Sequence, residues 1–280
     1  KQNAMNTNIY LIDNSNTTID SPHYQRATIE DVVSYCSDKH RLGVDTETEG
    51  FDFTCKKMIM FQIGDEDTQF VIDTRFVSIE PLRHILEDPS IIKVFHNAKF
   101  DYKFIKKWAN ITCEGIYDTF LTERILNCGK DGVRYGLKDV CKKYLNVELN
   151  KDVRNQFIGL TGQPYRNDQI VYGAKDVLYL LGVKDKQIPL IDKYALKEVV
   201  NLENAAVLAF ADIEYNGLDL DTEKWKLLEK SNTLSAQQYL ISLDQIVIED
   251  TKLNKFVHKY VQADMFTPID EIRKVNVKWT

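Results

Sequence analysis

Residues 57–73 read KMIMFQIGDEDTQFVID and contain two apolar runs separated by a short acidic turn. The first run is Lys57–Gly64 and the second is Gln69–Asp73, and both are rich in the apolar and β-branched residues that fit strands. The polar turn Asp65–Thr68 has a length that joins neighbouring antiparallel strands. This stretch therefore predicts a β-hairpin within a larger sheet.

Further strand and helix patterns surround the hairpin. Residues 42–46 and 91–95 are strand candidates, and a helix over residues 78–87 leads into the second of them. After Asn97 the pattern is helical, with helices expected at 97–109, 118–127, 135–145 and 167–181. Strands and helices in this order indicate an α/β fold in which helices flank a sheet.

The C-terminal third of the chain is expected to be almost wholly helical. Residues 201–214 carry a helical apolar period, which Asn216 and Gly217 end, and Asp221 is placed to cap a following helix. We therefore expect an α/β domain over residues 5–197 and a C-terminal helical extension over residues 198–280.

The bulk composition is that of an ordinary globular protein, with 44% hydrophobic and 28% charged residues among 280. No run approaches the roughly 18 apolar residues of a membrane helix, so no membrane association is expected. The five cysteines include no Cys-x-x-Cys pair, which favours reduced thiols and a cytoplasmic location over a disulfide framework or a zinc site. The net charge of −6 argues against a large basic surface but leaves a carboxylate-based nuclease open.

The first of three polar motifs is DTETEGFD at residues 45–52. Asp45 and Glu47 are two residues apart, so on a strand both carboxylates face the same side. Asp45 ends an apolar strand candidate, where a carboxylate is costly unless it is paired or holds a metal. Taken alone, the pair is explained equally well by a solvated strand end, because the chain has 42 acidic residues.

The other two motifs each pair a polar side chain with an aspartate four residues later. Asn97 and Asp101 lie in FHNAKFD, and Tyr172 and Asp176 lie in YGAKD, so on helices each pair shares a face. Each has an ordinary explanation too, since Asn97 could cap its helix and Tyr172 could be a core residue. Their conjunction with the first motif indicates one divalent-metal site.

In this order the three motifs resemble those of the DEDD superfamily of 3′→5′ exonucleases, in its tyrosine-bearing branch, with Phe100 at the aromatic position of the second motif. The string DTETEGFD is closer to the proofreading domain of family A DNA polymerases than to ribonuclease D. The resemblance covers about residues 25–190. It implies a ribonuclease-H-like fold with a mixed sheet of about five strands.

The resemblance also implies a hydrolytic site with two divalent ions, Mg²⁺ or Mn²⁺. The metal ligands would be Asp45, Glu47, Asp101 and Asp176, which are catalytic together with Tyr172 as the residue that orients the attacking water. Phe51 would wedge against the terminal base, and Asp118 would have a supporting role. The substrate-binding residues would be Thr46, Phe51, Asn97 and Phe100.

Residues 203–221 and 274–280 resemble parts of the same polymerases that follow the exonuclease domain, so we expect a polymerase domain that is missing from this chain, with a stand-alone nuclease as the alternative. The expected substrate is the 3′ end of single-stranded DNA, with RNA as an alternative. Two other interpretations stay open: a ribonuclease-D-like enzyme that trims RNA, and an inactive nucleic-acid-binding domain. Solvated helix faces, more than a phosphate track, explain most of the clustered lysines: Lys99, Lys103, Lys106, Lys107, Lys138, Lys142 and Lys143.

Overall fold

The computed structural model describes residues 8–14, 21–149, 153, 156–160 and 162–253, and the backbone of residues 258–260 and 274–276. The chain forms two compact units, Lys1–Gly217 and Leu218–Thr280.

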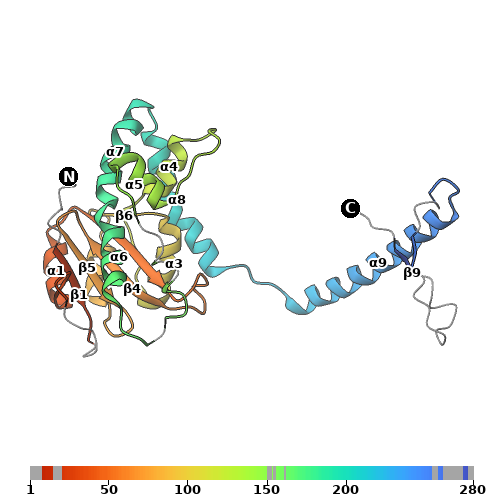
Figure 1. Ribbon diagram of the computed structural model, residues 1–280, viewed down its shortest axis with the longest axis horizontal. Helices are drawn as coiled ribbons and strands as arrows, with labels where there is room; N and C mark the ends of the chain where they lie inside the picture. Colours follow the sequence, from red (N-terminus) through yellow and green to blue (C-terminus); the bar gives the residue numbers. More distant parts are fainter. Residues whose placement is uncertain are drawn as a thin grey trace. The chain divides into compact units, whose positions relative to one another are not determined.

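A seven-stranded sheet forms the centre of the first unit (Figure 1), with the strand order β2-β1-β5-β4-β3-β6-β7. Strand β4 is antiparallel to β3 and β5, whereas the other neighbouring strands are parallel. The mixed sheet confirms the predicted fold class. The strands are β1 (Asn8–Ile12), β2 (Gln25–Arg26), β3 (Arg41–Thr48), β4 (Met58–Gly64), β5 (Thr68–Asp73), β6 (Ile92–Phe95) and β7 (Ile116–Asp118).

The predicted hairpin is the β4–β5 pair, in which Gly64 lies opposite Gln69. The Asp65 carboxylate closes the turn by accepting the backbone N–H groups of Asp67 and Thr68, each at 3.0 Å. The sheet has seven strands, whereas the family resemblance implied about five. The sequence pattern identified four of the seven and missed β1, β2 and β7. Strands as short as β2 and β7 show no alternation that a sequence pattern could reveal.

Helices cover both faces of this sheet and pack beside the β6–β7 edge (Figure 1). Helices α1, α2, α3 and α8 share one core cluster with the sheet, α6 lies across the opposite face, and α4 and α7 pack on β6. The bounds are α1 (Ile29–Ser37), the 3₁₀ turn η1 (Glu80–Leu82), α2 (Arg83–Leu86), α3 (Ala98–Ala109), α4 (Thr119–Leu126), α5 (Leu137–Leu145), α6 (Asn167–Leu178), α7 (Leu180–Lys193) and α8 (Lys197–Asn216).

Three helices differ from the prediction. Helix α1 was not predicted, and the helix expected at 78–87 consists of η1 and the single turn α2. The helix expected at 167–181 is two helices, because the regular helix is interrupted by a turn at Tyr179, with φ of −96° and ψ of −10°, between α6 and α7. Helix α8 ends at Gly217, whose φ of 68° explains the Asn-Gly break. The first unit extends to Gly217, so residue 197, after which a domain boundary was expected, lies inside this unit.

The second unit contains α9 (Thr222–Glu249) and an antiparallel pair of short strands, β8 (His258–Tyr260) and β9 (Lys274–Asn276). The Asp221 carboxylate caps α9 by accepting the backbone N–H of Lys224 at 3.0 Å, as predicted. Residues 274–280 resemble a polymerase segment in the sequence analysis. The described residues include β9, which covers 274–276, and residues 277–280 lie outside them. In the described part of the chain, no helix combines the length and the apolar character needed to cross a bilayer.

Candidate active site

Alternation along β3 decides which side chains reach the site. Asp45 lies opposite Gln62 of β4, and both side chains face α6, as does that of Glu47. Helix α6 approaches this face closely, since a Cβ added to Gly173 would lie 2.7 Å from Gln62 Nε2. The close approach brings Asp176, one turn further along α6, to the two strand carboxylates.

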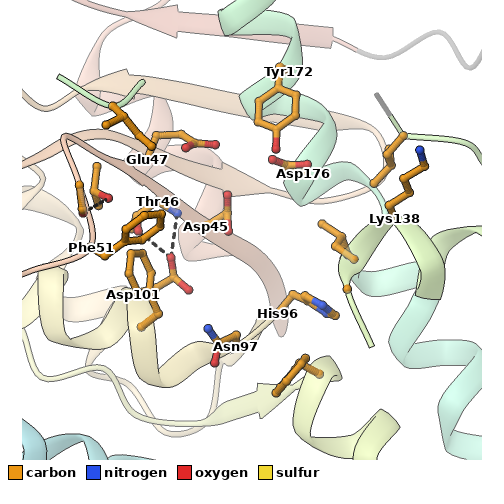
Figure 2. A pocket seen from close by; sticks show the side chains of 18 residues that line it. Asp45, Thr46, Glu47, Phe51, His96, Asn97, Asp101, Lys138, Tyr172 and Asp176 are labelled. Atoms are coloured by element: carbon orange, nitrogen blue, oxygen red, sulfur yellow. Dashed lines mark hydrogen bonds between the residues drawn. The ribbon is translucent and has the colours of Figure 1, made fainter. Parts of the chain in front are cut away.

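One oxygen each of Asp45, Glu47 and Asp176 lies within 4.8 Å of the others. Figure 2 shows the three carboxylates facing a common point, with Glu47 and Asp176 buried and Asp45 half-buried. Three carboxylates this close repel one another unless protons or a cation reduce their charge. Oxygen donors of this kind are the preferred ligands of Mg²⁺ and Mn²⁺, so the residues present fit a divalent ion.

Asp101 lies on α3, on the other side of β3, and is 3% exposed. Its Oδ1 accepts the hydroxyl of Thr46 at 2.6 Å and the Thr46 backbone N–H at 3.1 Å, as the dashed lines in Figure 2 mark. Burial, and then the charge of Asp45, raise the pKa of Asp101 well above its ordinary value. Asp101 lines the same cavity as the other carboxylates but is not in the group of three. Its role as a metal ligand stays a prediction.

The Tyr172 hydroxyl points toward Asp176 at the wall of this cavity (Figure 2). Burial and the neighbouring charges of Asp176, Glu47 and Asp45 raise the pKa of Tyr172. The phenol is therefore protonated at neutral pH and can donate a hydrogen bond, whereas a phenolate base is disfavoured. The Tyr172 ring packs against Phe157, with 6.1 Å between the ring centroids.

Asn97 stands at the start of α3 with a left-handed φ of 78°, and its side chain makes no capping hydrogen bond. Asp118 caps α3 in its place, because its two carboxylate oxygens accept the backbone N–H groups of Asn97 and Ala98, each at 2.9 Å. Asp118 also caps α4 through the N–H groups of Phe120 and Leu121. One buried carboxylate thus orients the starts of two helices, and the exposed Asn97 side chain is left at the cavity wall.

A cavity of about 230 Å³ opens above the carboxylates. Phe51 lies at its wall and is 71% exposed, with its ring in edge contact with Phe100 at a centroid distance of 6.4 Å. A large exposed aromatic side chain beside a carboxylate site is suited to stacking on a base.

Nine further residues line the cavity without having been proposed as site residues, and His96, Phe120 and Lys138 are the aromatic and charged side chains among them. His96 Nδ1 lies 2.9 Å from the Thr119 hydroxyl, which itself donates to the Phe95 carbonyl oxygen, so Nδ1 carries the proton. In the sequence, only the position of His96 next to Asn97 indicated that His96 could belong to the site. For Lys138 the only indication was its place in a lysine cluster.

Most of the clustered lysines have acidic partners within the protein. Lys99 and Lys103 bind Glu214, and Lys106 binds Asp212, both of α8. On α5, Lys142 binds Glu148 and Lys143 binds the buried Glu123. Of the seven lysines, Lys138 is the one among the residues that line the cavity. These ion pairs argue against a phosphate track along the clusters, although Lys103 and Lys106 contact α8 and do not form the solvated helix face that was expected.

A model of the family described as 3′-5′ exonuclease matches residues 22–192, more than half of the chain. The human exosome complex component 10 is 30% identical over 146 residues, which cover 51% of this chain and 16% of that protein. Ribonuclease D of Haemophilus influenzae is 26% identical over 166 residues, covering 57% of this chain and 40% of that protein.

DNA polymerase I of Aquifex aeolicus is 26% identical over 223 residues, covering 71% of this chain and 36% of that protein. The chain thus matches less than half the length of each of these curated relatives. Among solved structures, NrnC of Brucella melitensis superposes with a TM-score of 0.62 at 21% identity, covering 77% of this chain and 98% of that one. The superposition supports the fold. The expected setting in a family A polymerase is not confirmed, because ribonuclease and exosome relatives match as well.

Proposed function

Since the chain belongs to the DEDD-type 3′-5′ exonucleases, we propose that it removes nucleotides from RNA 3′ ends by divalent-metal-dependent hydrolysis. The observation that carries the proposal is the group of three carboxylates, within 4.8 Å of one another, at a cavity with the exposed Phe51 at its wall. The similarity to ribonuclease D supports RNA as the substrate.

Asp45, Glu47 and Asp176 would hold the first ion, and Asp101 would share a second ion with Asp45. Bound divalent ions supply water activation and neutralise charge on the phosphate during hydrolysis. Tyr172 keeps its proton and donates a hydrogen bond that orients the attacking water. The use of two ions follows the family resemblance and is part of the proposal.

The aromatic wall would hold the 3′-terminal nucleotide. Phe51 and Phe100 offer ring faces to the terminal base, a contact that accepts every base. Thr46 and Asn97 line the same cavity, where sugar and phosphate oxygens would be placed. Such a site predicts cleavage with little sequence preference.

A second candidate function is proofreading of DNA 3′ ends as part of a family A polymerase. The match to DNA polymerase I favours it, because that match covers 71% of the chain and extends over more residues than the matches to ribonuclease D and the human exosome component. An inactive binding domain is disfavoured, because all four predicted carboxylates and the tyrosine line one cavity. A cytoplasmic location stays a prediction.

The test uses RNA and DNA single strands of the same sequence, each labelled at the 5′ end, with Mg²⁺ or Mn²⁺. A 3′-5′ exonuclease gives a ladder of shortening labelled products, whereas cleavage from the 5′ end releases the label at once. We expect faster shortening of RNA, and faster shortening of DNA would favour proofreading.

Variants of the site and of the surface complete this test. Asp176→Asn should lower the rate by more than about 100-fold, since even indirect disturbance of a metal site costs 10–100-fold. The control Asp38→Asn changes an exposed aspartate at the end of α1 and should leave the rate unchanged. Wild-type rates in folded Asp176→Asn would remove the proposed site.

A further inference from the structure

Helix α8 lies beyond residue 192, where the match to the exonuclease family ends, yet it packs into the same unit. Val207 and Ala211 are buried in the core cluster that α3 shares with the sheet. The Asn204 side chain accepts the backbone N–H of Asp118 at 2.6 Å. Helix α8 thus contacts the residue that orients the start of α3.

Polar contacts hold the last two turns of α8 against α3. The Asp212 carboxylate accepts hydrogen bonds from Tyr102 at 3.0 Å and from Lys106 at 2.6 Å. Glu214 forms ion pairs with Lys99 and Lys103 at 2.5 and 2.6 Å. Four contacts from Asp212 and Glu214, two residues apart, fix the C-terminal end of α8, where Tyr215 lies.

Tyr215 stacks on Phe53 with a centroid distance of 5.4 Å and an interplanar angle of 20°. The Lys103 ammonium lies 5.3 Å from the Phe53 ring, and the Lys106 ammonium lies 5.1 Å from the Tyr215 ring. Phe53 also meets Phe104 of α3 edge-on at 6.5 Å. The ring of Phe53 is therefore held between α3 and the end of α8.

Phe53 belongs to the turn that presents Phe51 to the cavity. The Asp52 carbonyl oxygen accepts the backbone N–H of Lys56 at 2.8 Å, and the Trp108 indole donates to the Lys56 carbonyl oxygen at 2.8 Å. These bonds fix the far end of the turn, whereas the Phe53 ring fixes its near end, two residues from Phe51. Because Phe51 is 71% exposed, its own packing gives it little orientation.

We propose that Tyr215 is a positioning residue of the exonuclease site, which acts through Phe53 to hold Phe51 in place for the terminal base. The inference rests on the proposed function, since it assumes that Phe51 contacts substrate. Tyr215 is not among the residues that line the cavity, so its loss should weaken substrate binding and leave the hydrolytic step intact. A residue with a merely structural role would instead lower stability without a selective effect on KM.

The test compares steady-state shortening of a single-stranded oligonucleotide by wild type and by Tyr215→Ala, Tyr215→Phe and Ile213→Ala. Tyr215→Phe keeps the stacked ring, and Ile213 is an exposed side chain on the same turn of α8. We expect Tyr215→Ala to raise KM about fivefold, which is part of the binding energy that a base–aromatic stack contributes. Its kcat should stay within about twofold of the wild-type value. The other two variants should match wild type.

The same substitutions are then made in a Phe51→Ala background. If Tyr215 acts through Phe51, Tyr215→Ala should raise KM no further there. An equal rise in both backgrounds, an unchanged KM in Tyr215→Ala or Phe51→Ala, or a fall in kcat alone would overturn the inference. Absence of any 3′-end shortening by wild type would instead show that the proposed function is wrong.

Discussion

Replacing Gly173 by alanine should separate the activity of this protein from its stability. Gly173 lies in α6 between Tyr172 and Asp176, where the helix is closest to β4. An added Cβ would lie 2.7 Å from Gln62 Nε2 and 2.9 Å from Met60 Sδ. Gln62 is fully buried, so its amide has little room to move away. We therefore expect α6 itself to shift.

The size of the shift follows from these contacts. Ordinary contact begins at 3.4 Å, so the helix must retreat by 3.4 − 2.9 to 3.4 − 2.7, or about 0.5–0.7 Å. Displacing reactive groups by about 1 Å can cost 100-fold in rate, so a shift of this size should lower kcat about tenfold. Overpacking costs about 1–3 kcal/mol, but exchanging a helical glycine for alanine returns about 1 kcal/mol. Unfolding free energy should therefore fall by at most about 2 kcal/mol.

The assay pairs single-turnover shortening of a 5′-labelled oligonucleotide with urea unfolding. The matched control is Gly182→Ala in α7, where an added Cβ would meet Leu145 at 3.4 Å, an ordinary contact. We expect Gly182→Ala to keep its rate and to gain up to about 1 kcal/mol in stability. Wild-type kcat in folded Gly173→Ala, or equal behaviour of the two variants, would refute the reasoning.

Three other outcomes are expected. Asp118→Ala should lower the unfolding free energy in urea by about 2–4 kcal/mol, because it removes the cap of two helices; a loss below about 1 kcal/mol would contradict this role. Burial lowers the pKa of Lys93 to about 8, so the folded chain binds fewer protons than the unfolded chain above that pH. The unfolding free energy of wild type should therefore rise with pH through this range. Relative to wild type, Lys93→Met should lose up to about 2 kcal/mol of unfolding free energy between about pH 8 and about pH 9.5. If the unfolding free energies of the two proteins in urea change identically with pH, this role of Lys93 is excluded. With a chelator present, Asp176→Asn should have a higher Tm than wild type, because the variant removes one of three crowded charges. Added Mn²⁺ should raise the Tm of wild type but not that of the variant. A Mn²⁺-dependent rise in the Tm of the variant would count against the site.

Much of the fold could be predicted because local patterns specify it. The β4–β5 hairpin follows from two apolar runs and a polar turn, and α3, α4 and α5 begin within two residues of their expected starts. The strands β2 and β7 were missed because two or three residues carry no period. The break at Tyr179 was missed because the apolar pattern continues across it.

The candidate site was predictable as a set of residues but not as an arrangement. Spacing placed Asp45 beside Glu47 on one face of a strand, and Asp176 one turn from Tyr172. It gave no sign that Asp101 would approach β3 from the opposite layer and bind Thr46, the residue between the two strand carboxylates. His96 and Lys138 were missed as cavity residues, because the packing of separate elements brings them to the cavity and residue spacing does not reveal that packing.

The sequence by itself determined the elements, the motif spacing and the chemistry of the side chains, because these depend on backbone geometry over a few residues. The tertiary structure alone decided which carboxylates meet, which lysines are paired and where α8 belongs. The Asp212 and Glu214 ion pairs join residues more than 100 positions apart. Such contacts depend on how whole layers pack, and no local period of a chain records that.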